Sequence, residues 1–269
     1  MDITIWIGII AGLVAIVGGF LMDGGEFSGL LQFTAALIVF GGTAAAVVIS
    51  FPKSKLRTIP AALKVAFGRE DIPNGRYIKD IVNMATISRR SGVLALERNS
   101  MDHPSPFLRE GIQLVVDGTD QEQLKQMLSL ELDAVEQEYE GYAKIFESAG
   151  GYAPTMGIIG TVMGLIHVLS SLTEPTSLGP SIALAFTATL YGVASANLIF
   201  LPIASKIKAR GELEVHTMEL LMHGIIAIQN GENPQLVQRK LSLFDRTSGT
   251  DSRSRPIAKA EEGFHESAN

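Results

Sequence analysis

The stretch that decides the fold is Ser148–Thr173, which reads SAGGYAPTMGIIGTVMGLIHVLSSLT and contains no Asp, Glu, Lys or Arg. Its 26 residues exceed the roughly 20 apolar residues that a helix needs to cross a bilayer. Three more stretches also contain no Asp, Glu, Lys or Arg and have at least 20 residues: Ile3–Met22, Phe27–Pro52 and Pro175–Ser205. Soluble cores rarely exclude every charge over such lengths, and these stretches lack the alternation of barrel strands. The sequence therefore predicts four transmembrane helices.

Charge is distributed very unevenly along the 269-residue chain. All 50 Asp, Glu, Lys and Arg residues lie in the 166 residues outside the four stretches. The absence of cysteine excludes a disulfide-stapled domain, and the net charge of −6 gives no support for nucleic-acid binding. The first stretch follows only Met1-Asp2 and lacks a cationic leader, so we expect a retained span instead of a cleaved signal peptide.

The charges that flank the spans predict their orientation. The linker Asp23–Glu26 carries no cation, whereas several cations follow the second and fourth spans: Lys53, Lys55, Arg57, Lys64, Lys206, Lys208 and Arg210. Cytoplasmic loops carry an excess of Lys and Arg, so both termini are expected in the cytoplasm. Five parts result: spans one and two in 1–52, a helical cytoplasmic domain in 53–147, spans three and four in 148–205, cytoplasmic C-terminal helices in 206–245 and a disordered tail in 246–269.

Apolar spacing predicts two helices in the cytoplasmic domain, over Tyr77–Arg90 and Phe107–Val116. A longer helix over Asp120–Phe146 continues into span three, and Thr119 followed by Glu122 is typical of a capping box at its start. Pro154 predicts a bend where this helix meets the membrane.

Motifs for catalysis or metal binding are scarce. The sequence Gly157-Ile158-Ile159-Gly160 lies inside a span and predicts helix packing, not a dinucleotide site. His216 and His223 favour a surface pair over a metal site. His167 is a candidate by default because it lies within a span, but its position near the outer end favours no functional role. We expect no enzymatic activity and no cofactor.

None of the four spans contains an acid, although ion-driven membrane proteins usually carry Asp or Glu at mid-bilayer. If the protein moves ions, a partner must supply the carboxylate. Spans three and four each carry small and hydroxyl residues on one face: Gly157, Gly160, Thr161 and Gly164, then Ser181, Ala185, Thr189, Gly192 and Ala196. Helix packing explains the glycines. The hydroxyls of Thr161 and Thr189 are candidate ligands for a desolvated cation.

Several motifs, taken together and in their order along the chain, resemble those of the MotA/PomA/MotP stator subunits of the bacterial flagellar motor. The motifs are Gly41-Gly42-Thr43, Ile49-Ser50-Phe51-Pro52, the segment from Ser88 to Glu97, Val116-Asp117-Gly118, the segment from Tyr152 to Gly157, Leu178-Gly179-Pro180 and Thr189-Leu190-Tyr191-Gly192. The resemblance extends to about Phe244. It implies an all-α integral membrane protein with four transmembrane helices and a helical cytoplasmic domain between the second and third.

The resemblance also implies partners and a mechanism. Five copies would surround a dimer of a MotB-like single-span subunit, whose essential Asp supplies the missing carboxylate. Ion flow through the bacterial inner membrane would turn the ring of subunits and drive the rotor switch protein FliG. The only bound species expected is the transported cation, and the surroundings are membrane lipid.

Site residues carry over where the motifs match. Arg89, with Arg90 as the alternative register, and Glu97 match the charged pair that meets the rotor, although residues alone indicate a solvated helix face. Pro154 and Pro202 match two prolines that couple ion flow to movement.

The resemblance favours sodium over proton as the transported ion, because proton-type members often have Ala at the position of Thr161. Ala188 departs from the sodium pattern, with Thr187 one position earlier, and divalent cations remain open. Two rivals remain: an ExbB/TolQ-like energiser of outer-membrane processes, which has three spans, and a non-conducting scaffold. The acidic linker Asp23–Glu26 between two uncharged stretches favours four spans.

Overall fold

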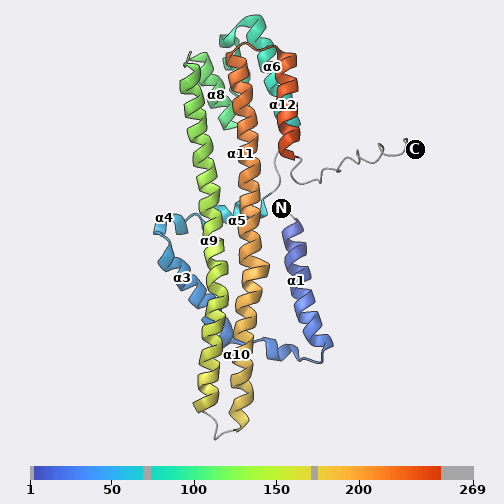
Figure 1. The fold of residues 1–269 in the computed structure, drawn as a ribbon, viewed down its shortest axis with the longest axis vertical. Helices are drawn as coiled ribbons and strands as arrows, with labels where there is room; N and C mark the ends of the chain where they lie inside the picture. Colours follow the sequence, from blue (N-terminus) through green and yellow to red (C-terminus); the bar gives the residue numbers. More distant parts are fainter. Residues whose placement is uncertain (1–2, 69–73, 171–174, 250–269) are drawn as a thin grey trace, which may run out of the picture. The chain divides into compact units, whose positions relative to one another are not determined.

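The structure is a computed structural model that describes residues 3–68, 74–170 and 175–249 (Figure 1). Every regular element in these ranges is helical, which confirms the predicted all-α class. Four segments among the described residues are long and apolar enough to span a membrane: Thr4–Met22, Phe27–Ser50, Gln121–Ser170 and Leu178–Gln229. The helices form two compact units, Met1–Asp71 with Asp133–Val215 and Ile72–Leu132 with His216–Asn269.

The first unit begins with the 20-residue helix α1 (Ile3–Met22). Shorter elements follow: the 3-10 helix η1 (Phe27–Leu30), α2 (Phe33–Ala36), the π-helix η2 (Leu37–Gly41), α3 (Gly42–Ser50), α4 (Lys53–Leu56) and α5 (Ile59–Phe67). Span two is therefore not one regular helix, because Leu31 and Gln32 have extended backbone angles. Gly24 turns the preceding linker at a φ of 86°.

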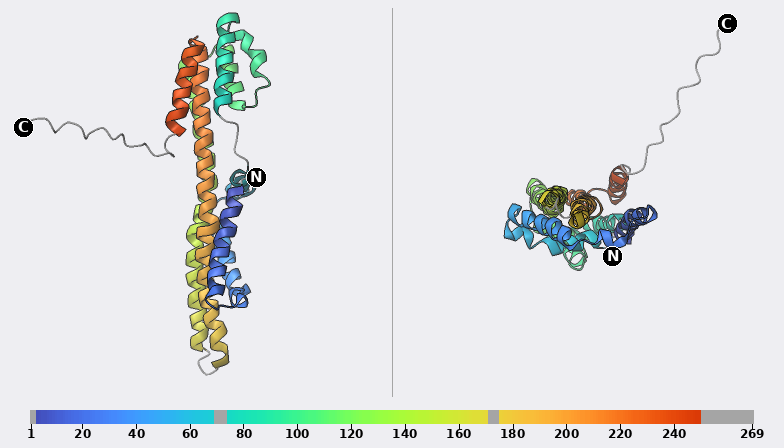
Figure 2. Two further views of the ribbon diagram at one scale, coloured as in Figure 1. Left: turned by 90° about the vertical axis from the view of Figure 1, so that its right-hand side faces the viewer. Right: turned by 90° about the horizontal axis from the view of Figure 1, so that it is seen from below.

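Three long helices complete the transmembrane part: α9 (Gln121–Ser170), α10 (Pro175–Ser195) and α11 (Leu201–Gln229), the last preceded by the π-helix η4 (Ala196–Phe200). α9 continues through Pro154 without ending, so this proline lies inside a 50-residue helix. α1 packs against η4 (Figure 2). Gly12 lies next to Leu198 in this contact.

The start of α9 differs from the predicted capping box. The carboxylate of Asp120 accepts a hydrogen bond from the backbone N–H of Glu122 at 3.0 Å, and the helix begins one residue later. Asp is as good an N-cap as Ser or Thr, and it lies directly before the first helical residue. Asp120, not Thr119, therefore caps the helix.

α9 and α10 lie side by side because small residues line their contact (Figure 1). A Cβ added at Gly160 would lie 2.5 Å from the Cβ of Ala188, and one added at Gly164 would lie 2.8 Å from the Cβ of Ala185. A Cβ added at Gly192 would lie 2.5 Å from a backbone oxygen, the carbonyl of Ala153. The predicted small-residue stripes thus form a helix–helix contact within the chain.

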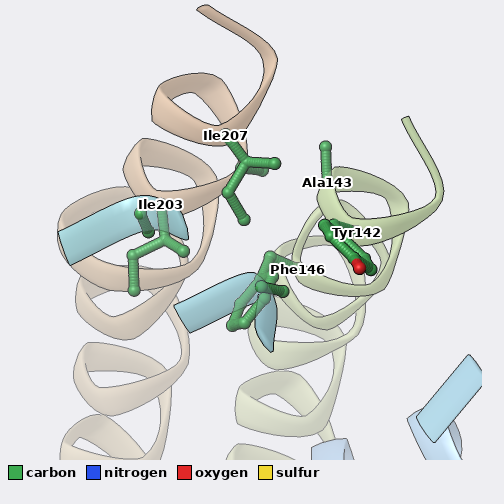
Figure 3. Packing of buried hydrophobic residues seen from close by; sticks show 8 residues of the cluster. Tyr142, Ala143, Phe146, Ile203 and Ile207 are labelled. Carbon is green, nitrogen blue, oxygen red and sulfur yellow. The ribbon is translucent and has the colours of Figure 1, made fainter. Parts of the chain in front are cut away.

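Where the charge-free part of these helices ends, α5, α9 and α11 enclose a hydrophobic cluster: Ala62, Ala66, Tyr142, Ala143, Phe146, Ile203, Ala204 and Ile207. Figure 3 shows Phe146 of α9 pointing toward Ile203 and Ile207 of α11. Next to this cluster, Lys208 and Glu147 form an ion pair at 2.6 Å. The cluster fixes α5 against both long helices.

The second unit contains α6 (Asn74–Ser91), the 3-10 helix η3 (Val93–Ala95), α7 (Leu96–Ser100), α8 (Pro106–Val116) and α12 (Pro234–Gly249), together with parts of α9 and α11. Both helices predicted for this region are present, α6 and α8. Their apolar faces are buried, as the periodicity of α6 predicted.

α12 reaches Gly249, four residues into the segment predicted to be a disordered tail, and residues 250–269 lie outside the described residues.

Two histidines of α11 hold α12 through one phenylalanine. The ring of His216 stacks on Phe244 at a centroid distance of 4.9 Å, and His223 meets the same ring edge-on at 5.1 Å. Burial lowers the pKa of His223, Lys240 and Lys125 lower it further, and Glu219 opposes them. The histidine pair is therefore a packing feature of the second unit.

We expect Gly192→Ala to destabilise the first unit by about 1–3 kcal/mol, the usual effect of overpacking. The reason is that the added Cβ meets a backbone oxygen, which cannot rotate away. The thermal unfolding midpoint of the detergent-solubilised protein measures the effect. Gly179→Ala on the same helix is the matched control, because a Cβ there has nothing within 4 Å. Equal midpoints for the two variants would contradict the close contact.

A second prediction concerns pH. The folded-state pKa of His223 is below its ordinary value of 6.5, so the unfolded chain binds this proton more readily. The contribution of His223 to stability is therefore present above about pH 6.5 and is lost as the pH falls below it. Unfolding followed from about pH 8 to pH 5 should show a smaller loss of stability in His223→Gln than in the parent. Parallel pH profiles of the parent and His223→Gln would show that protonation of His223 does not affect stability.

Candidate functional site

Thr161 of α9 and Thr189 of α10 lie together at the contact between the two helices. Their hydroxyls are hydrogen-bonded to each other. Thr161 Oγ1 also lies 3.0 Å from the carbonyl oxygen of Ala185 and 3.1 Å from that of Gly157. Both threonines are half-buried. The structure therefore brings together the two hydroxyls that the sequence singled out.

The four oxygens of this group have more lone pairs than the two hydroxyl protons can occupy. Each hydroxyl carries one proton and can accept from other donors, whereas the carbonyls of Ala185 and Gly157 only accept. Thr161 can donate to one neighbour at a time, although three oxygens lie within hydrogen-bonding distance. A group of neutral oxygens with spare lone pairs is suited to accept from a further hydrogen-bond donor or to bind a cation.

No carboxylate accompanies this group of oxygens. The four charge-free stretches contain no Asp or Glu, and no cluster of three or more His, Asp or Glu residues occurs within the described ranges. His167 is exposed, six residues after Thr161 on α9, and none of the four oxygens belongs to it. The chain by itself offers oxygen ligands without a compensating negative charge.

Thr187 has a different role from Thr189. It is buried, and its hydroxyl lies 3.5 Å from the carbonyl oxygen of Gly29, in the element η1. It therefore binds the start of span two and does not join the pair formed by Thr161 and Thr189.

Tyr191 is a residue that sequence reasoning missed. Its hydroxyl accepts a hydrogen bond from the backbone N–H of Gln32 at 3.2 Å and donates one to the carbonyl of Leu30. Its ring also stacks on Phe40. A phenol can donate and accept at once, so Tyr191 satisfies both sides of the break in span two. The only available signal was an aromatic residue inside the motif around Thr189.

Pro154 and Pro202 occupy different environments. Pro154 is half-buried inside α9, and its missing N–H leaves the carbonyl of Gly150 without a helical partner. Pro202 is exposed, and it is the second residue of α11, two positions after the end of the π-helix η4. The two helices meet near both prolines, because Gly150 packs against Leu201. Sequence periodicity gave no sign of η4 or η2, although π-helical turns often mark functional positions.

Arg89, Arg90 and Glu97 lie close along the chain in the second unit. Both arginines are in the last turn of α6, Glu97 is in the first turn of α7, and all three are exposed. Gly92 makes the turn between them at a φ of 81°, which favours glycine. The structure therefore presents both signs of charge on one exposed turn.

A buried histidine holds this region in place, and sequence reasoning did not find it. His103 Nε2 lies 3.4 Å from Asp80 Oδ2 on α6, and its Nδ1 accepts a hydrogen bond from the backbone N–H of Ser105 at 3.1 Å. Ser105 in turn caps α8 by accepting from the N–H of Leu108. The loop between α7 and α8 is thereby tied to α6.

Two family models match the chain. Residues 6–92 match Motility protein A N-terminal, and residues 99–220 match the MotA/TolQ/ExbB proton channel family. The N-terminal match covers the first two spans and much of the segment before α7.

Relatives and solved structures agree with these models. An uncharacterized protein of Bacillus subtilis, YtxD, is 34% identical over 262 residues, which are 97% of this chain and 96% of that protein. Motility protein A of the same organism is 35% identical over 245 residues, 91% of each chain. The flagellar MotAB stator complex from Bacillus subtilis matches with a TM-score of 0.84 at 34% identity, over 91% of this chain and 98% of that chain. The chain therefore belongs to the MotA/PomA/MotP family of membrane-embedded flagellar stator A subunits.

Proposed function

We propose that this subunit joins a MotB-like single-span partner to form a cation channel that converts ion-motive force into rotation of the flagellar rotor. The observation that carries the proposal is the oxygen group around Thr161 and Thr189 in spans that contain no acid. Such a group can replace part of a cation's hydration shell but cannot neutralise its charge. The essential Asp that the family resemblance assigns to the partner would complete the site.

Sodium is the favoured ion, ahead of proton. A proton would need only the partner's Asp, whereas the hydroxyls and carbonyls at Thr161 add ligands that a proton does not require. Oxygen ligands of this kind suit a hard cation. The departure at Ala188 does not remove a ligand from the pair, because the buried Thr187 binds the carbonyl of Gly29 instead.

The surrounding assembly follows from the same resemblance. Several apolar residues of α9 and α10 are exposed in the single chain: Ile158, Val162, Ile166, Ile182, Phe186 and Val193. Such surfaces require lipid, a partner span or neighbouring copies around them, and the proposed assembly of five copies around two partner subunits supplies all three. Both termini would lie in the cytoplasm, as would residues 53–147 and 206–245.

The proposed output is a contact with the rotor switch protein FliG through Arg89 or Arg90 and Glu97, which are exposed. Pro154 and Pro202 would act as hinges, because each interrupts backbone hydrogen bonding where α9 meets α11. The transported cation would be the only bound species, with no other cofactor.

The first test replaces the hydroxyls. In cells that carry the protein with its partner and no other stator, Thr161→Ala and Thr189→Ala should each raise the sodium concentration for half-maximal swimming speed. The expected increase is about tenfold or more, the usual effect of removing one oxygen that binds a charged group. Swimming speed at fixed pH measures it.

The controls are Thr161→Ser and Thr189→Ser, which keep the hydroxyl and should restore the parent response. Unchanged speed in both alanine variants would show that the pair does not line the ion path. Speed that follows pH and not sodium would assign the proton instead. If the unmutated protein does not support swimming even with its partner, the result would favour an ExbB/TolQ-like energiser or a scaffold.

The second test addresses the rotor contact. Glu97→Lys should abolish most swimming while the complex still assembles, because like charges placed opposite each other at an interface are strongly unfavourable. Co-purification with the partner and swimming speed measure the two properties separately. Glu136→Lys on α9 is the control, since it reverses another exposed acid. Loss of the complex in Glu97→Lys would indicate a folding role for this side chain.

A further inference from the structure

Four cations on α4, on α5 and on the turn between them form a surface that the proposed function does not use. They are Lys53, Lys55, Arg57 and Lys64, called here the α4–α5 cations, and all four are exposed. Residues 53–68 contain no Asp or Glu, so this segment carries four positive charges in a chain with a net charge of −6. Within the described part of the chain, none of the four forms an ion pair.

The position of the segment is set by packing. Ala62 and Ala66 of α5 are fully buried in the cluster with Phe146 of α9 and Ile207 of α11. Those residues lie next to the ends of the charge-free stretches, which begin again at Ser148 and end at Ser205. α4 follows span two after Ser50. The charge-free parts of spans two, three and four therefore all end beside α4 and α5.

An aromatic pair marks the same level. The ring of Trp6, in the first turns of α1, lies 5.6 Å from the ring of Phe67 at the end of α5. Tryptophan is enriched where hydrocarbon meets headgroups. All four spans thus reach the headgroup region beside the α4–α5 cations, where phosphate groups lie.

Other cations at this level are already engaged. Lys208 is paired with Glu147 at 2.6 Å, and Arg210 donates to the carbonyl oxygen of Gly68 at 2.7 Å. Lys144 of α9 is also exposed at this level, but within the described residues only the α4–α5 segment gathers four exposed cations beside the bilayer. Clusters of four or more Lys and Arg directly next to a span are typical of anionic lipid recognition.

We propose that the α4–α5 cations form a binding site for anionic phospholipid headgroups of the cytoplasmic leaflet. The same cations also predict the orientation of the spans. The proposed site has a further role, because it binds anionic lipids and so enriches them around spans one and two. Its existence does not depend on which ion the stator conducts.

The single tryptophan of the chain provides the measurement. Trp6 lies next to Phe67, three residues after Lys64, so lipids with brominated acyl chains that bind at this segment should quench its fluorescence. In vesicles of phosphatidylglycerol and phosphatidylcholine, the full chain should show preferential quenching by brominated phosphatidylglycerol. We expect a preference of about fivefold or more, the factor that one cation near a lipid surface supplies. Salt at about 0.5 M should reduce it.

Replacing all four α4–α5 cations with Gln should bring the preference close to one. The matched control replaces four exposed cations of the second unit with Gln: Arg76, Lys79, Arg109 and Lys125. It loses the same charge and should keep the parent preference. If the fourfold variant fails to fold, the double variant Arg57→Gln with Lys64→Gln should lower the preference severalfold.

A charge-keeping variant separates binding from folding. Exchanging Lys for Arg and Arg for Lys at the four positions should retain the preference, since phosphate attracts both cations. The proposal would be overturned by a parent without lipid preference, by a fourfold Gln variant that keeps it, or by equal losses in the control set. Contact of the four cations with acidic residues of a neighbouring protein in the assembled complex would also overturn it.

Discussion

The close approach of α9 and α10 is the constraint on which the candidate ion site depends. Glycines at 157, 160 and 164 leave no room for a Cβ against α10, so the two backbones nearly touch. Only at this separation can Thr161 reach both Thr189 and the carbonyl of Ala185. Helices in lipid gain little from apolar contact, and packing with interhelical hydrogen bonds must hold the pair together. The same contact thus creates the site and stabilises it.

Much of the fold is predictable because its determinants are local. Charge-free stretches of bilayer length must be helical, since lipid offers the backbone no hydrogen-bond partners. α8 was expected over Phe107–Val116 and occupies Pro106–Val116, because its Ser-Pro start is a local signal. Thr161 and Thr189 were each placed on a small-residue face. Their direct contact could not be predicted, because it depends on the register between two helices separated by a turn.

The remaining features depend on distant parts of the chain. Tyr191 bonds to Leu30 and Gln32, some 160 residues away, and only because span two breaks at Leu31. The charge-free pattern of residues 27–52 does not predict that break, because it indicates only that the segment can span the bilayer. The π-helical turns η2 and η4 shift the register by one residue without a compositional signature. Asp120 replaced Thr119 as the cap of α9 because adjacent polar residues compete for one position.

The absence of an acid near Thr161 has a consequence for how the site works. The hydroxyls of Thr161 and Thr189 bond to each other, and Thr161 Oγ1 lies within hydrogen-bonding distance of two carbonyls, so the group is stable without an ion. A cation entering it would gain ligands but no neutralising charge, and an unneutralised charge in hydrocarbon is costly. Occupancy therefore becomes favourable only when a carboxylate approaches from another subunit. Under the proposed function, an ion that binds only while two subunits are correctly placed would link its own passage to their relative position, as the coupling of ion flow to rotation requires.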